Sequence, residues 1–288
     1  MPDAPVDLDP HDDLDQRLLG LVPTEDALVW VLPLASHLCR PDGALFGGTA
    51  LAASLRLMEL ATGRAALWAT VQFVTSARVD DRLDCRVVIG ARGHHVDQVR
   101  VEASIDGAVV FEALGSTADP RDGAMTGVGV TMPTVPPPDD CPLWEGPGGV
   151  MAGLTSVGHH ERAEYRVAEL QGLEAAHGAV AMWGRLVGEG ATTSAKLGFL
   201  GDMVPLAVTR SAGVEGVGTS LDNSIRLARL VDSEWLLVHL QGHAAQDGYG
   251  YGVGHFWSPD GQLLATSSQT AKLFDLETLI RRHRDQRA

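Results

Sequence analysis

Apolar and polar residues alternate along several segments of the chain, a pattern typical of strands buried on one face. Residues 99–105 read Val-Arg-Val-Glu-Ala-Ser-Ile, and apolar-rich runs at 27–32, 85–89 and 236–240 predict further strands. Two Asp-Gly pairs stand between such runs, at 106–107 and 260–261. Because Asp and Gly tolerate positive φ, each pair predicts a β-hairpin.

Two segments have the pattern of helices. Residues 49–62 carry charge only at Arg56 and Glu59, and Gly63 follows as a C-terminal glycine. A helix this apolar on most sides is expected to be buried. A second helix is predicted at 194–204, where Pro205 must end or kink it.

The same order of features occurs twice. Residues 77–83 resemble 228–235, and each stretch leads to an apolar strand, a Gly-His pair (93–94 and 242–243) and an Asp-Gly hairpin. Each copy also places its helix ahead of these strands. The sequence therefore predicts an α+β fold of two tandem units, each with one buried helix wrapped by an antiparallel sheet.

The segment between the copies is rich in Pro and Gly, which disfavours regular elements. We expect an N-terminal unit at 16–118, a linker at 119–158 and a C-terminal unit at 159–288.

Composition argues against several classes of partner and site. The 288 residues have a formal net charge of −15, which argues against a nucleic-acid partner. Three scattered cysteines without a CxxC pair suggest neither a disulfide framework nor a thiolate metal site, and no other metal set emerges. An acidic N-terminus without an apolar core does not resemble a signal peptide, and no uncharged run is long enough to span a bilayer. We expect a cytoplasmic protein without a bound cofactor or metal.

Several short motifs occur in a fixed order. They read Leu-Phe-Gly-Gly at 45–48, Gly-Asp-Met at 201–203, Thr-Ser-Leu-Asp-Asn-Ser at 219–224, Glu-Trp-Leu-Leu at 234–237 and Ala-Thr-Ser-Ser-Gln at 265–269. In this order the chain resembles the type II acyl-CoA thioesterase (TesB-like) family. The resemblance implies a double hotdog fold.

In that family an Asp, a Ser or Thr and a Gln together hold a water. By the resemblance the Asp corresponds to Asp222 and the Gln to Gln269, and the hydroxyl position falls at about His243, a departure from the family pattern. The resemblance also implies that Gly47 and Gly48, at the start of the first helix, bind the thioester carbonyl and face the Asp of the second copy.

Other assignments remain open at this point. Asp202, on the otherwise apolar second helix, is an alternative acid, and Glu59 is a weaker one. Gln72 stands where the first copy would have its Asp222, which predicts one site per chain. His243 is either a base oriented by Asp222 or a turn residue, because Gly93–His94 has the same place in the first copy.

These features predict an acyl-CoA thioesterase that activates water, with its acyl chain along the apolar helix–sheet interface. The two units of one chain imitate a hotdog dimer, and we expect whole chains to form a homo-oligomer. One alternative is an acyl- or lipid-binding protein without activity. Another is an enoyl-thioester hydratase that uses His37 or His243.

Overall fold

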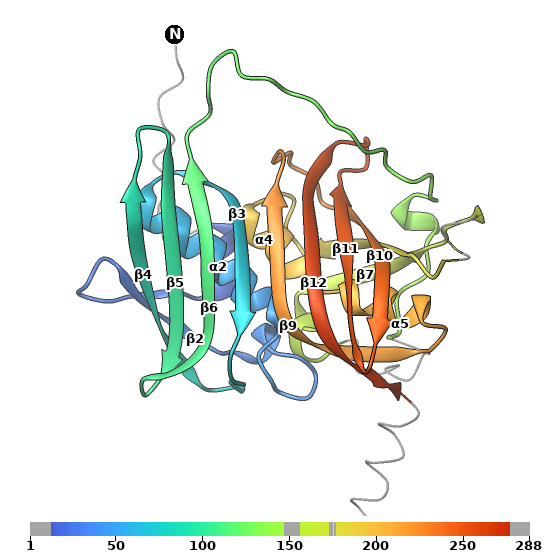
Figure 1. The fold of residues 1–288 in the computed structure, drawn as a ribbon, viewed down its shortest axis with the longest axis horizontal. Coiled ribbons are helices and arrows are strands. Elements are labelled where there is room, and N and C mark those ends of the chain that lie inside the picture. Colours follow the sequence, from blue (N-terminus) through green and yellow to red (C-terminus); the bar gives the residue numbers. More distant parts are fainter. Residues whose placement is uncertain (1–12, 147–155, 173–174, 176, 277–288) are drawn as a thin grey trace, which may run out of the picture.

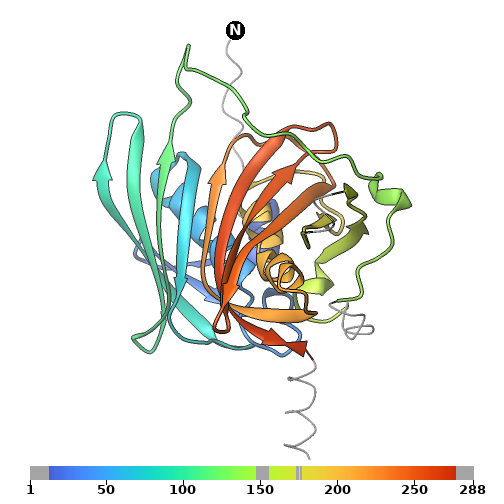
Figure 2. The same ribbon diagram turned by 45° about the vertical axis from the view of Figure 1, so that its right-hand side comes forward.

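A computed structural model describes residues 13–146, 156–172, 175 and 177–276. In this part of the chain twelve strands form one antiparallel sheet that curves around the helices (Figure 1, Figure 2). The strands are β1 Val22–Pro23, β2 Val29–Pro33, β3 Ala65–Phe73, β4 Arg82–Arg92, β5 Val96–Ile105, β6 Ala108–Ala118, β7 Ala163–Ala168, β8 Val180–Leu186, β9 Gly216–Leu227, β10 Leu236–Gln246, β11 Tyr249–Trp257 and β12 Leu263–Asp275.

The strand order shows the internal repeat directly. It runs β1-β2-β4-β5-β6-β3-β9-β12-β11-β10-β8-β7, so the second half mirrors the first about the β3–β9 pair. The predicted Asp-Gly hairpins join β5 to β6 and β11 to β12. At the first of them Asp106 and Gly107 adopt φ of 50° and 80°, which few other residue types tolerate.

The helices lie on the concave face of this sheet (Figure 2). They are α1 Leu14–Leu19, α2 Gly47–Thr62, α4 Ser194–Leu200 and α5 Val204–Ser211. As predicted, Gly63 ends α2, with φ of 71°. The second long helix is broken: α4 stops at Leu200, and Pro205 lies in the first turn of α5, where its missing N–H costs nothing.

One predicted equivalence between the copies is wrong. Gly93 and His94 lie in the turn between β4 and β5, whereas Gly242 and His243 lie inside β10. The pairing register of β10 with β11 shifts between Gly242 and Ala244, which makes His243 the extra residue of a β-bulge. The C-terminal unit turns instead at Asp247, so the two Gly-His pairs occupy different places.

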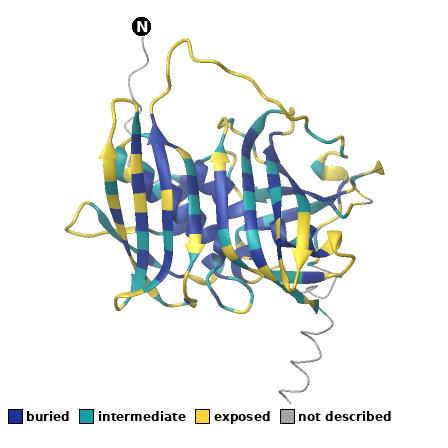
Figure 3. Cartoon of the chain, in the orientation of Figure 1, coloured by how far each residue is buried: buried dark blue, intermediate teal, exposed yellow. Residues whose placement is uncertain are grey.

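Burial follows the alternation in the sequence. Buried and exposed residues alternate along β4 and β5 (Figure 3). The linker crosses from β6 to the far edge of the sheet (Figure 1) and packs on the outer face of the C-terminal unit, where the Trp183 indole donates to Pro136 O at 2.8 Å. None of the described helices is long and apolar enough to cross a membrane.

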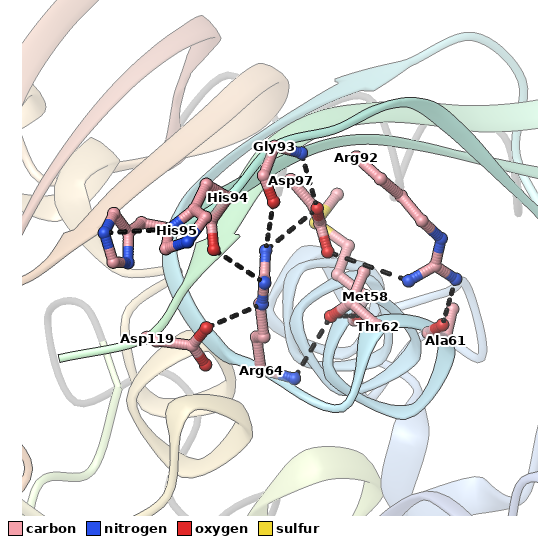
Figure 4. Close-up of polar contacts among 10 residues, drawn as sticks. All are labelled: Met58, Ala61, Thr62, Arg64, Arg92, Gly93, His94, His95, Asp97 and Asp119. Carbon is pink, nitrogen blue, oxygen red and sulfur yellow. Dashed lines mark hydrogen bonds and ion pairs between the residues drawn. The ribbon is translucent and has the colours of Figure 1, made fainter.

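An arginine ties the end of α2 to the β4–β5 hairpin (Figure 4). The Arg64 guanidinium donates to Gly93 O and Asp97 Oδ1, both at 3.0 Å, and to His94 O at 3.1 Å. It also forms an ion pair with Asp119 at 2.9 Å. Asp97 is only 1% exposed and also accepts from the Gly93 amide at 3.1 Å, and Arg64 is its nearest charged partner.

We predict that Arg64→Ala lowers the free energy of unfolding by about 2–4 kcal/mol, because it removes the nearest cation from a buried carboxylate and leaves it the Gly93 amide as a donor. Arg92→Ala is the matched control: its side chain is 61% exposed and 3.9 Å from Asp97, so the loss should stay below about 1 kcal/mol. Urea unfolding measures both variants. Equal losses would contradict the role given to Arg64.

Candidate active site

Asp202 lies in the break between α4 and α5, facing the N-terminus of α2. The helices approach closely there because Gly47 lacks a side chain: a methyl group on Gly47 would collide with the Asp202 carboxylate. The N-terminal unit thus supplies a helix start and the C-terminal unit a carboxylate. The site belongs to both copies.

Four donors surround the Asp202 carboxylate. Its Oδ2 accepts a hydrogen bond from the Gly48 amide at 3.1 Å. Its Oδ1 accepts from Asn223 Nδ2 at 3.1 Å, from Ser220 Oγ at 3.3 Å and from Gln269 Nε2 in a short contact. Gln269 Nε2 also donates to Ser220 Oγ at 2.6 Å, so the four side chains form one network.

A β-bulge brings these side chains onto one face of the sheet. Asn223 pairs with Gln269 across β9 and β12, but the register shifts so that Leu221 is an extra residue. In a regular strand Ser220 and Asn223 would point to opposite faces. The bulge puts both toward the helices and leaves Leu221 42% exposed.

The enclosure changes the proton affinity of the carboxylate. Burial raises the pKa of Asp202 to about 6, because a charged carboxylate loses hydration in this position. The donors from Gln269, Ser220, Gly48 and Asn223 act in the opposite direction and lower the pKa. Asp202 and Ser220 are of intermediate burial, whereas Asn223 and Gln269 are buried.

Two acceptors of the network have no partner among the described residues. They are Asn223 Oδ1 and Gln269 Oε1, in side chains that are 0% and 2% exposed. A buried amide oxygen without a donor is unfavourable by about 1–3 kcal/mol. Both atoms are therefore suited to accept hydrogen bonds from a bound water or substrate.

Three of the residues predicted from sequence lie in this network or beside it. Gln269 and Gly48 hydrogen-bond to Asp202, and Gly47 lies against it. The predicted contact between the first helix and an Asp of the second copy is present, but the carboxylate in it is Asp202.

The other two predicted residues lie elsewhere. Asp222 follows the bulge and precedes Asn223, so its side chain points to the other face; its Oδ1 accepts from the Thr270 amide at 3.0 Å. His243 is exposed on β10, and its ring contacts Tyr251. The hydrogen-bond partners of Asp202 in the described part of the chain are Gly48, Ser220, Asn223 and Gln269 instead.

The corresponding place in the N-terminal unit is apolar. Leu67 is the extra residue of β3, as Leu221 is of β9, so the register equates Ala69 with Asn223 and Gly115 with Gln269. A methyl group on Gly115 would stand 2.6 Å from Met58 Sδ, so the methionine fills this space.

This register corrects the place given to Gln72. Gln72 pairs directly with Asp222 across β3 and β9, and Trp68 is the residue equivalent to Asp222. Glu59, the weaker candidate, accepts from the Ala66 amide at 3.0 Å, and burial raises its pKa. Within the described residues, the full polar network occurs in one unit only.

The pKa of Asp202 has a consequence for stability. Its folded value of about 6 exceeds the unfolded value of about 3.9, so the folded state binds this proton more tightly. The contribution to folding is complete below about pH 4 and is lost as the pH rises through about 6.

We predict that the unfolding free energy of the wild type, relative to Asp202→Asn, falls by about 1–3 kcal/mol between about pH 4 and pH 7. Urea unfolding of the two proteins at matched pH values measures this difference. A difference that stays constant or grows with pH would refute the assignment of a raised pKa.

Two family models match this chain. The family model of the acyl-CoA thioesterase N-terminal domain matches residues 36–118, and that of the C-terminal domain matches 138–273. No curated protein matches the chain in sequence. The exact domain boundaries expected from the sequence stay predictions.

Solved structures extend the comparison. A putative thioesterase from Novosphingobium aromaticivorans is 28% identical, with a TM-score of 0.77 over 88% of this chain and 97% of the other. A hotdog protein of Alicyclobacillus acidocaldarius is 20% identical (TM-score 0.76, 91% and 98% covered). The tesB protein of Mycobacterium avium subs paratuberculosis is 19% identical (TM-score 0.72, 90% and 98% covered). The predicted double hotdog fold is confirmed, and the chain belongs to the acyl-CoA thioesterase family.

Proposed function

We propose that this protein hydrolyses acyl-CoA to a free acid and CoA at the Asp202 network. The observation that supports this most directly is a carboxylate with a pKa near neutrality, enclosed by one hydroxyl and two amides and still partly open to solvent. An Asp, a hydroxyl residue and a Gln are the set implied by the family resemblance. Here they are Asp202, Ser220 and Gln269 rather than the predicted Asp222, His243 and Gln269.

Asp202 acts as the general base. Above about pH 6 its carboxylate is ionised and accepts a proton from a water held in the network. The second O–H of that water donates to one of the unpartnered amide oxygens, Gln269 Oε1 or Asn223 Oδ1, which orients the water. As the water oxygen bonds to the thioester carbon, the carbonyl becomes an oxyanion.

The start of α2 stabilises the oxyanion. Its first amides have no partner within the helix, and the dipole of a 16-residue helix favours negative charge at this end. The Gly48 amide already donates to Asp202, so we assign the oxyanion to the amide of Gly47, the first residue of α2. The intermediate then expels the CoA thiolate, which takes the proton from Asp202.

We predict that Asp202→Asn lowers kcat at least about 100-fold, because it removes the base and keeps the shape. Asp222→Asn is the matched control. It makes the same change on β9, two residues after Ser220, in a side chain that faces away from the network, and should alter kcat less than about threefold. Release of free thiol from a panel of acyl-CoA esters measures both.

If Asp222→Asn lowered kcat more than Asp202→Asn, then Asp222 and not Asp202 would be the general base. Complete absence of turnover by the wild type, together with a co-purified lipid in native mass spectrometry, would favour the non-catalytic binding protein instead. Loss of double-bond absorbance without thiol release would favour the hydratase.

We also infer that the protein works in the cytoplasm and as a homo-oligomer. The thiols of Cys39, Cys85 and Cys141 are free and buried, which suits a reducing compartment. The mirrored halves of the sheet support a further pairing of whole chains. A monomer in sedimentation velocity would contradict the second inference.

A further inference from the structure

The packing of α5 against the sheet limits which acyl groups the site can accept. The sequence predicted an acyl chain along the helix–sheet interface, but α5 rests directly on glycines of the sheet. A methyl group on Gly218 would stand 2.6 Å from Pro205 Cβ, and one on Gly250 would stand 2.5 Å from Val208 Cγ1. Because carbon atoms pack at about 3.5–4.0 Å, an alkyl chain does not fit under this helix.

The direction between the two central helices is closed as well. A methyl group on Gly198 of α4 would stand 3.1 Å from the Ala52 amide nitrogen in α2. A methyl group on Gly48 of α2 would collide with Phe199 O of α4. These contacts involve backbone atoms, which cannot swing aside as a side-chain terminus can.

Two aromatic rings lie beside the helix break. Phe256, 0% exposed, lies under it, with Cζ 3.0 Å from where a methyl group on Gly201 would be. Tyr165, 2% exposed, donates to Leu200 O at 3.5 Å. Tyr165 also lines a pocket of about 220 Å³ together with Trp144 and His160.

We propose that the protein acts on thioesters of short, compact acyl groups, and that Phe256 sets the upper limit of their size. This inference rests on the proposed thioesterase function. The acyl group stays between the Asp202 network and the solvent-exposed side of the site. A longer chain would have to displace these packing contacts to be buried, and each methylene left in solvent loses the burial that would offset its ordering.

The test is kcat/KM of the purified full chain on straight-chain acyl-CoA esters from acetyl to palmitoyl, each below its micelle concentration, with a free-thiol readout. We expect the highest values for about two to six carbons and a fall of at least about tenfold by dodecanoyl-CoA. A profile that is flat or highest at long chains would overturn the inference and leave the thioesterase function intact. No turnover at any length would overturn both.

Substitution of Phe256 tests whether this residue limits the size of the acyl group. Phe256→Ala and the milder Phe256→Leu enlarge the space under the helix break, so the preferred chain should lengthen and the ratio of octanoyl- to butanoyl-CoA kcat/KM should rise at least about threefold. The control is Phe111→Ala, which removes an equally buried ring, 0% exposed, from the N-terminal unit.

Phe111→Ala lowers stability in the same way but should leave the chain-length profile unchanged. If Phe256→Ala does not fold, Phe256→Leu decides. An unchanged profile in Phe256→Leu, or an equal shift in Phe111→Ala, would overturn the role of Phe256.

Discussion

The hydrogen bond from the Gly48 amide to the Asp202 carboxylate joins the two halves of this protein at their functional centre. It requires the start of one helix to meet the break in another within 3.1 Å. Glycine at position 47 makes that approach possible, because any larger residue would displace the carboxylate. The mirrored sheet, with β3 beside β9, holds both helices in this relation.

The break between α4 and α5 gives the carboxylate its chemical character. A residue inside a continuous buried helix would have no path to solvent, whereas Asp202 at the break is partly exposed and surrounded by donors. Desolvation raises its pKa to about 6, and the donors limit the rise. The same close packing that creates this environment leaves little volume for an acyl chain. Reactivity and substrate size therefore follow from one feature of the packing.

Much of the fold could be read from the sequence because it depends on local patterns. Alternation along 99–105, the Asp-Gly hairpin at 106–107 and the apolar helix ending at Gly63 each follow a short-range rule. The side chains of the site depend on longer-range geometry. A single extra residue at Leu221 reverses which side chains of β9 face the helices, and this bulge has no distinct sequence signal. The sequence therefore favours Asp222 as the site carboxylate, whereas in the structure the side chains that face the helices at this point are those of Ser220 and Asn223.

Asp202 has a signal of its own in the sequence. It is a charged residue in an apolar helical segment, three residues ahead of a proline, and such a position is costly unless the charge is used. The Gly-His match between the copies favoured a turn at His243, but this residue is the extra residue of a β-bulge in β10, because adjacent Gly and His occur in two different structural contexts.

The proposed chemistry depends on Asp202 being an enclosed carboxylate with a pKa near neutrality. Carbon-13 NMR of the side-chain carboxyl groups, assigned by comparison with Asp202→Asn, measures this pKa directly across the pH range. We expect a resonance that titrates at about pH 6 and is missing from the variant. A carboxyl group at this position that titrates near the ordinary aspartate value of about 3.9 would contradict it.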